Sequence, residues 1–269
     1  MKPKLTLACS VTESHLKEFL LLKFSAELFH ECEWFLSCDS YCYEFFKREQ
    51  YENCRCENLN LQNGKVFGNE EEISNFYGVI DGKFRATESA IISKGECLLV
   101  DSDIIFCGEF EGVSPDVDAA VCPHYQWDSN MDQAWGFYNV GFVFIRSLEF
   151  LKAWEKETKS GRHQFEQVPI QVVVDFGKFY VQRLPICHNM GWWRFNSKEK
   201  KHRTYSFGCW NDRILFDGNF VSCFHLHTFI DCHHSKPFGE FVFNYLLSTT
   251  SDGKEILKEY DRLKSWSAY

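Results

Sequence analysis

The chain has 269 residues, of which 45% are hydrophobic and 25% charged, as in an ordinary soluble globular protein. Its formal net charge of −9 argues against a general binder of nucleic acid or anionic membranes, because both reward a basic surface. We expect neither a signal peptide nor a transmembrane anchor, since the apolar runs are too short for either. The 13 scattered cysteines then favour reduced thiols in a cytoplasmic protein.

The first 106 residues predict strands and helices in alternation. Apolar and polar residues alternate in "KLTLACSV", and Ser10 with Glu13 fits a capping box for the helix that follows. Gly95 is expected to end a later helix. In chain order we expect a strand at 4–11, a helix over 13–28, a strand at 33–39, a helix over 42–49, a polar loop over 51–75, a helix over 82–95 and a buried strand at 96–101.

The second half is more mixed. Strands are expected at 118–123, 138–147, 179–185 and 220–229, with a helix over 147–161 and a shorter one within 164–177. The tail 239–264 predicts two helices that separate near Asp252–Gly253. The order of elements is typical of a parallel sheet with crossover helices. We therefore predict a single α/β domain over 1–269, with a mixed, mainly parallel central sheet flanked by helices.

The stretch "CLLVDSDIIFCGEF", residues 97–110, places Asp101 and Asp103 inside an apolar run. Burying an unpaired carboxylate costs several kcal/mol, so such a pair needs partners. An isolated D-x-D most often makes a turn, in which Asp accepts local backbone N–H groups. This pair, however, follows a central strand, where α/β sheets bind ligands. Two carboxylates there can share Mg²⁺ or Mn²⁺, with substrate phosphates completing its shell.

Five segments around this pair occur in an order that resembles the GT-A fold glycosyltransferases. They are "KFRATESAIISKGECLLVDSDIIF", "WGFYNVGFVFIRS", "HQFEQVPI", "HNMGWWRFN" and "FVSCFHLHTF". They are most similar to bacterial and phage members and to the glycogenin-like group, in which the D-x-D holds a metal bound to the diphosphate of a nucleotide sugar. The resemblance implies a nucleotide-binding half (1–106), an acceptor-side half (107–238) and C-terminal helices (239–269).

The resemblance also implies ligands for the metal and the nucleotide sugar. Asp101, Asp103 and His225 would hold the metal, and the imidazole favours Mn²⁺ over Mg²⁺. We expect His227 to face away from His225, so that only one of the two is a ligand. Expected contacts to a UDP- or GDP-sugar are Ser10, Thr12, Asp39, Lys83, Arg85, Ser102, Gly141 and Lys236. Capping and turn formation for the first three, and a solvated helix face for Lys83 and Arg85, stay open as local alternatives.

The same resemblance implies a reaction, namely transfer of a hexose to a hydroxyl group of a glycan, a lipid-linked sugar or a protein. Asn139, Glu166 and Gln167 are the expected catalytic residues, with Glu166 as a candidate general base where the family more often has Asp. Acceptor contacts are expected from Asn189, Trp192 and Trp193, with at most one tryptophan stacked on a sugar. A late histidine before "KPF" resembles the retaining families, so we expect a retaining reaction.

Two other functions compete with sugar transfer. A nucleotidyltransferase of the same fold usually has a Gly-rich phosphate loop after its first strand, but "ACSVTESH" contains no glycine. A zinc-binding interaction module could use "CRC" at 54–56 and "HLHTFIDCHH" at 225–234, yet the chain has no C-x₂-C pair. A degenerate transferase that only binds sugars is a third possibility.

Overall fold

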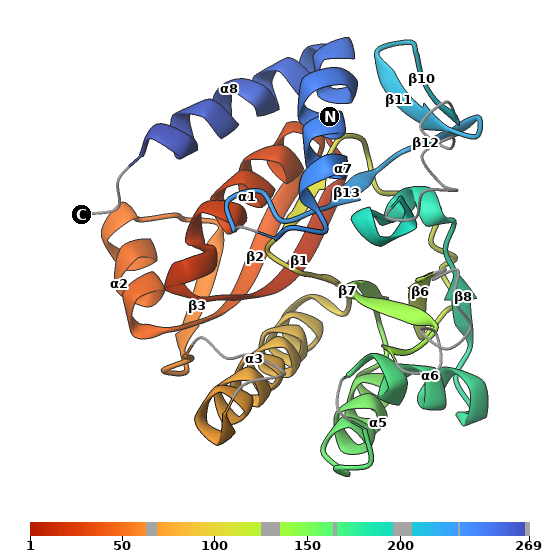
Figure 1. Ribbon diagram of the computed structural model, residues 1–269. Coiled ribbons are helices and arrows are strands. Elements are labelled where there is room, and N and C mark those ends of the chain that lie inside the picture. Colours follow the sequence, from red (N-terminus) through yellow and green to blue (C-terminus); the bar gives the residue numbers. More distant parts are fainter. Residues whose placement is uncertain (63–68, 125–134, 164–165, 196–205, 231, 267–269) are drawn as a thin grey trace.

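The computed structural model describes residues 1–62, 69–124, 135–163, 166–195, 206–230 and 232–266. Residues 164, 165 and 196, which belong to two of the segments named above, lie outside this range. A seven-stranded sheet in the order β3-β2-β1-β4-β7-β6-β8 forms the centre (Figure 1). Its strands are β1 (Lys4–Val11), β2 (Glu31–Cys38), β3 (Cys54–Asn58), β4 (Cys97–Val100), β6 (Ala119–Pro123), β7 (Tyr138–Ile145) and β8 (Val181–Arg183).

The sheet is mixed and mainly parallel, as predicted. The strands β3, β2, β1 and β4 run parallel to one another, and β7 is antiparallel to both β4 and β6. β4 is therefore the middle strand, with three strands on each side. Because carboxyl ends of parallel strands meet at one edge of a sheet, the turn after β4 lies at the ligand-binding edge of this fold class.

Helices cover both faces of the sheet (Figure 1). Leu7 and Cys9 of β1 contribute to the core on one face, whereas Ala8 contributes to the core on the other, as the alternation of a strand requires. The first face is covered by α1 (Leu16–Phe29), α2 (Ser40–Glu49), α7 (Lys236–Phe241) and α8 (Ser251–Ser265). The second is covered by α3 (Glu70–Lys94), α5 (Leu148–Thr158) and α6 (Gln167–Phe176).

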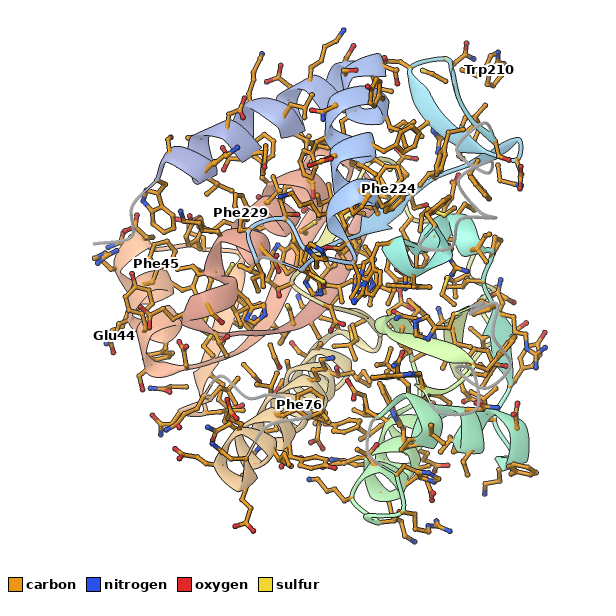
Figure 2. The ribbon with its side chains drawn as sticks, viewed as in Figure 1. Glu44, Phe45, Phe76, Trp210, Phe224 and Phe229 are labelled. Atoms are coloured by element: carbon orange, nitrogen blue, oxygen red, sulfur yellow. The ribbon has the colours of Figure 1, made fainter. Side chains whose placement is uncertain are left out.

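Two small sheets complete the fold. β10 (Phe207–Trp210), β11 (Arg213–Phe216) and β12 (Asn219–Phe220) form one, and Trp210 projects from it into solvent (Figure 2). β5 (Ile104–Phe106), β13 (Cys223–His225) and β9 (Met190–Gly191) form the other, with Phe224 fully buried. In the antiparallel pairing of β13 with β5, His225 lies opposite Ile104. This pairing brings the late histidine to the D-x-D turn.

Three local expectations are wrong. The expected loop over 51–75 contains β3 and the start of α3, because β3 is an edge strand with mostly exposed or half-buried side chains and so lacks apolar alternation. α3 begins with a capping box between Asn69 and Glu72. The proposed box of Ser10 with Glu13 does not form, since Ser10 lies within β1 and the Glu13 N–H donates to Asp39 Oδ2 at 2.6 Å.

The late elements are shorter than expected. Of the strand predicted over 220–229, only Cys223–His225 pairs in the small sheet, and Asn219–Phe220 belongs to β12. The two tail helices do separate, but at Thr250, whose hydroxyl accepts from Gly253 N and so begins α8 just before the predicted break. None of the helices in the described part of the chain is long and apolar enough to cross a membrane.

Candidate metal centre

Asp101 and Asp103 lie in the turn that connects β4 to β5. The turn is a local one, because Ile104 N donates to the Asp101 carbonyl at 3.3 Å, while Asp101 N donates to the Gly141 carbonyl of β7 at 2.9 Å. Ser102 is buried between the two aspartates. One ligand atom each from Asp101, Asp103 and His225 lies within 4.8 Å of the others. The turn and the ligand cluster are thus the same structure, and the three predicted metal ligands come together.

Asp103 and His225 form a buried pair. Their Oδ1 and Nε2 atoms are 3.2 Å apart, and both side chains are less than a tenth exposed. Burial acts to raise the pKa of Asp103, but His225 and His227 outweigh burial and hold that pKa well below its usual range. Burial likewise acts to lower the pKa of His225, and Asp103 more than compensates and raises it. The site therefore keeps a carboxylate anion in a buried place, as a metal ligand requires.

The proton position on His225 follows from a backbone amide. Gly141 N donates to Asn139 Oδ1 at 3.0 Å, which fixes the orientation of that side-chain amide. Asn189 Nδ2 donates to the same oxygen at 2.8 Å, so Asn189 Oδ1 faces His225 Nδ1 at 3.2 Å. An oxygen acceptor there requires the proton on Nδ1. In the neutral ring, the lone pair of Nε2 is then directed toward Asp103, and this is the tautomer that a metal-binding histidine needs.

Gly141 allows His225 and Asp101 to pack closely against the backbone of β7. A Cβ atom at this position of β7 would press against His225 Cε1 and lie 2.6 Å from Asp101 Oδ2. Only glycine fits between these two side chains without moving one of them. Two carboxylates and an imidazole whose lone pair is directed toward them fit Mn²⁺ or Mg²⁺.

Lys83 of α3 lies inside this site. Its Nζ is 2.8 Å from Asp101 Oδ1 and 3.0 Å from Glu166 Oε1, and its side chain is 14% exposed. The alternative of a solvated helix face is therefore wrong for Lys83. Burial acts to lower the pKa of Lys83. The negative charges of Asp101 and Glu166 outweigh burial and raise that pKa, so the ammonium stays charged. Arg85 is different, since it is exposed, has Glu57 3.7 Å away, and is not brought into the cluster.

The residues expected at the ends of β1 and β2 have local partners. Ser10 Oγ donates to the Val79 carbonyl of α3 at 3.2 Å, and Thr12 Oγ1 is 3.0 Å from His15 Nδ1. Asp39 accepts from Cys42 N at 2.8 Å and caps α2. Asp39 thus has the capping role, and the Thr12 carbonyl accepts from His15 N in a turn, whereas Ser10 takes part in neither a cap nor a turn. Nucleotide binding by Ser10, Thr12 and Asp39 stays a prediction.

Of the expected catalytic and acceptor residues, two lie at the start of α6 and two asparagines are buried beside His225. Glu166 and Gln167 lie at the start of α6, and Gln167 Oε1 is 3.5 Å from Asn139 Nδ2. Asn139 is 6% exposed and Asn189 is fully buried, with their amides committed to each other and to His225. Asn189 has no exposed surface and both of its amide atoms already have partners, so its contact with an acceptor stays a prediction that the burial does not favour.

The two tryptophans occupy a 3₁₀ turn (Trp192–Arg194) rather than a strand. The Trp193 ring packs edge-on against His225, with 4.9 Å between centroids, and Gly191 lies beneath it, where a Cβ atom would collide with the ring. Trp192 stacks with His234 at 6.2 Å. Trp193 is thus a wall of the metal centre. Stacking of a sugar on either ring stays a prediction.

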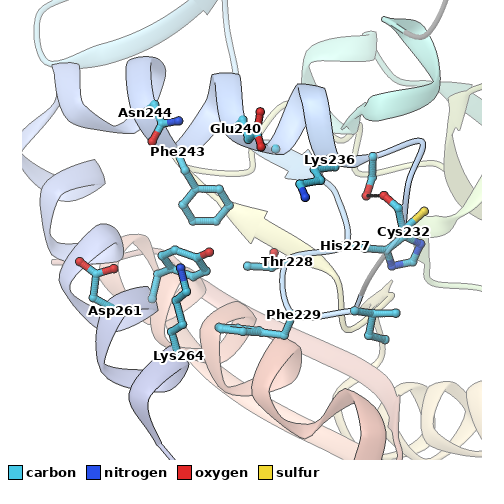
Figure 3. Close-up of a pocket in the computed structure, with 14 residues that line it drawn as sticks. His227, Thr228, Phe229, Cys232, Lys236, Glu240, Phe243, Asn244, Asp261 and Lys264 are labelled. Atoms are coloured by element: carbon cyan, nitrogen blue, oxygen red, sulfur yellow. Dashed lines mark hydrogen bonds between the residues drawn. The ribbon is translucent and has the colours of Figure 1, made fainter.

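His227 also reaches Asp103, contrary to expectation. Its Nδ1 lies 3.0 Å from Asp103 Oδ2, the oxygen that His225 does not contact. The expectation that it faces away is wrong because side chains two residues apart along extended chain share a face. Lys236 is exposed at the start of α7 and lines, together with His227, a cavity of about 530 Å³ (Figure 3). The cavity thus begins beside the metal centre.

Glu18 of α1 also lies at this centre, although none of the motifs in the sequence includes it. It is 2% exposed, and its Oε1 accepts from Thr228 N at 2.9 Å and from Phe229 N at 3.2 Å. Burial and, next, the charge of Asp103 raise the pKa of Glu18 to about 7. The available signal was a lone carboxylate within the apolar helix "LKEFLLLKF". A buried charge of this kind needs a partner, whereas a surface charge does not.

Neither a family model nor a curated protein sequence matches the chain. Solved structures do match it. The galactosyltransferase LgtC, crystallised with donor and acceptor sugar analogues, superposes over 98% of both chains with a TM-score of 0.58 at 13% identity. The glycosyltransferase GlyE of Streptococcus pneumoniae TIGR4 covers 98% of this chain with a TM-score of 0.55 at 14% identity, and 64% of GlyE is matched. The chain has the GT-A glycosyltransferase fold. In this GT-A fold the D-x-D turn follows the middle strand, as the sequence predicts.

Proposed function

We propose that the chain is a metal-dependent glycosyltransferase, which transfers a hexose from a UDP- or GDP-sugar to a hydroxyl group of a glycan, lipid-linked or protein acceptor. The observation that carries the proposal is the cluster of Asp101, Asp103 and His225 at the carboxyl edge of a GT-A sheet. These three side chains would hold Mn²⁺ or Mg²⁺. When bound, the cation would supply positive charge beside a diphosphate leaving group.

The chain's own cations and amides support the same reaction. Lys83 is paired with Asp101, and the exposed Lys236 lines the adjoining cavity, where it can bind a phosphate. Gln167 is suited to orienting sugar hydroxyls, whereas the buried Asn139, which is bonded to Gly141 N and Asn189, supports the position of His225. One solved LgtC structure carries a glutamine-to-glutamate change in its active site, and Gln167 is the residue we propose for that position. Because Glu166 is bound to Lys83, it is poorly placed as a free base, and we propose a retaining reaction.

The competing functions have less support. The turn after β1 has no glycine with which to wrap a phosphate, contrary to what a nucleotidyltransferase of this fold usually shows. In the described part of the chain, the groups of side chains that could hold a metal contain no cysteine, which counts against a zinc module. All 13 cysteines are free thiols, and this supports our proposal of a reducing, cytoplasmic compartment.

The test is incubation with a panel of UDP- and GDP-sugars and Mn²⁺, measuring release of the nucleoside diphosphate. We expect release from at least one donor, loss of release in Asp103→Ala, and unchanged release in the control Asp175→Ala, whose side chain is exposed on α6. NMR of the product's anomeric proton then reports retention. If no donor releases its nucleotide and none binds with Mn²⁺ by calorimetry, the proposal is wrong.

A further inference from the structure

The carboxylate of Asp103 faces two different sets of partners. Its Oδ1 faces His225, and its Oδ2 faces His227. On the His225 side, Asp101 completes the metal centre described above. On the His227 side, Glu18 takes the corresponding place, because one ligand atom each of Glu18, Asp103 and His227 lies within 4.8 Å of the others. Asp103 thus belongs to two groups of ligands, which we call the Asp101 cluster and the Glu18 cluster.

Two atoms of the Glu18 cluster are buried and lack a hydrogen bond. Glu18 Oε2 accepts none within the described residues, although Oε1 of the same carboxylate accepts two. His227 Nδ1 lies 3.0 Å from Asp103 Oδ2, yet the two are not aligned as a hydrogen bond. Buried polar atoms almost always have a partner, so two orphans at one place call for an explanation.

A cation shared by these atoms explains both observations. A metal bound to an imidazole nitrogen and to a carboxylate oxygen lies off the line that joins them, unlike a proton in a hydrogen bond. The imidazole nitrogen then does not point straight at the carboxylate oxygen, which agrees with the misaligned contact between His227 Nδ1 and Asp103 Oδ2. The same cation would use the free lone pairs of Glu18 Oε2. A cation at this place would also lie between two buried carboxyl groups, where a positive charge is favourable.

We propose that Glu18, Asp103 and His227 bind a second Mn²⁺, and that Asp103 bridges it to the cation of the Asp101 cluster. Two carboxylates and one imidazole are the ligand types that the Asp101 cluster also offers, so the same ion suits both. Paired metal sites that share a ligand are a recurrent device for clamping phosphate oxygens. The inference goes beyond the proposed function, because one cation suffices for that function.

The position of the second ion indicates what it would meet. His227 lines the cavity of about 530 Å³ that extends along α7 and α8, as Figure 3 shows. Two lysines and two acidic residues line the same cavity, namely Lys236, Lys264, Glu240 and Asp261, and Phe229 and Phe243 supply apolar walls. A ligand with phosphate oxygens entering this cavity could complete the shell of the second ion.

The experiment counts Mn²⁺ on the purified chain. Calorimetric titration and metal analysis after desalting are expected to give two Mn²⁺ per wild-type chain, and electron paramagnetic resonance to show a spectrum broadened by coupling between the ions. Glu18→Gln is expected to weaken the second Mn²⁺ at least tenfold and to restore an uncoupled spectrum. Asp101→Asn is expected to weaken the other ion in the same way. The control Glu255→Gln, exposed on α8, is expected to keep both ions.

The outcomes separate the second site from the proposed function. A single Mn²⁺ that is lost in Asp101→Asn and unchanged in Glu18→Gln would overturn the second site and leave the proposed function standing. A single Mn²⁺ that is lost only in Glu18→Gln would support the Glu18 cluster and overturn the metal assignment of the proposed function. If Glu18→Gln does not fold, His227→Ala replaces it, because that side chain is 30% exposed and its loss leaves no cavity in the core.

Discussion

A single backbone amide determines how His225 presents its nitrogen to Asp103. The chain of contacts runs from Gly141 N through Asn139 and Asn189 to His225 Nδ1, and each step has only one orientation that satisfies the previous one. Asn139 and Asn189 are therefore positioning residues. From the sequence, both asparagines are expected to contact a ligand. Their burial and their hydrogen bond to each other show that they support His225.

Replacing Asn189 by Leu tests this role. The change leaves Asn139 Oδ1 and His225 Nδ1 each short of one buried partner, so we expect Mn²⁺ affinity to fall by about 10- to 100-fold. The free energy of unfolding should fall by about 1–3 kcal/mol. Asn189→Asp keeps the oxygen that accepts from Nδ1, and should recover part of the affinity. Calorimetry with Mn²⁺ on the three proteins is the measurement, and equal affinity in Asn189→Leu would contradict the role.

Gly141 gives a second prediction at the same scale. In Gly141→Ala, the added methyl group pushes against His225 and Asp101, so Mn²⁺ affinity should drop at least tenfold while the β7 strand still forms. Gly208→Ala is the matched control, since a Cβ atom at this strand position meets nothing within 4 Å. Both variants are titrated with Mn²⁺ by calorimetry. If Gly141→Ala binds Mn²⁺ as tightly as the control does, the close packing of His225 and Asp101 on Gly141 is not needed for metal binding.

Among the elements, α3 connects the edge of the sheet to the metal centre. It spans Glu70–Lys94, begins with the capping box of Asn69 and Glu72, and ends at Gly95. Its buried face packs on β1 and β2, and this packing places Lys83 between Asp101 and Glu166. The helix thus holds a cation against two carboxylates that come from distant parts of the chain.

Removing that cation should cost stability. In Lys83→Met, the buried Glu166 and the partly buried Asp101 lose their shared counter-charge, so we expect a loss of about 3 kcal/mol in the free energy of unfolding. Lys159→Met serves as the control, because Lys159 is half exposed and its ion pairs are worth less than about 1 kcal/mol. Urea unfolding of both variants is the measurement. Equal losses would show that the buried triad adds nothing beyond a surface pair.

At the scale of the whole molecule, folding buries several titratable groups that are far apart in the sequence from the residues that surround them. His124 at the end of β6 is an example, since it is 5% exposed and packs edge-on against Trp193 with 4.7 Å between centroids. Burial and, next, the charge of Arg194 lower the pKa of His124 to about 3. The folded protein therefore keeps His124 neutral at a pH where the unfolded chain protonates it.

This histidine should make the fold acid-sensitive. Between pH 6.5 and about 3 the unfolded chain binds one more proton at His124 than the folded chain does, so stability falls as the pH falls. At pH 5 the loss is about 2 kcal/mol relative to neutral pH. His124→Gln should lose less stability than the wild type between pH 7 and pH 5, measured by urea unfolding. The exposed control His233→Gln should behave like the wild type, and an unchanged pH dependence in His124→Gln would refute the assignment.

Local pattern was enough for much of this protein. Alternating and helical spacing predicted the strands β1, β2 and β4 and the place of the D-x-D after a central strand. The mixed sheet and the meeting of Asp101, Asp103 and His225 were implied by the resemblance to ordered family segments. Local pattern failed at β3 and at the start of α3, because exposed polar residues carry no periodic apolar signal.

Only the tertiary structure decided what surrounds these ligands. Lys83 and Arg85 are two residues apart on one helix, and packing buries the first and leaves the second in solvent. Asn189 changes from a surface ligand to a buried positioning residue, and Glu18 joins from a helix that the motifs do not include. The physical reason is that burial and contact between distant segments depend on how sheet and helices stack. The sequence by itself determined which groups are of a kind that binds cations, and the fold decided which of them lie together.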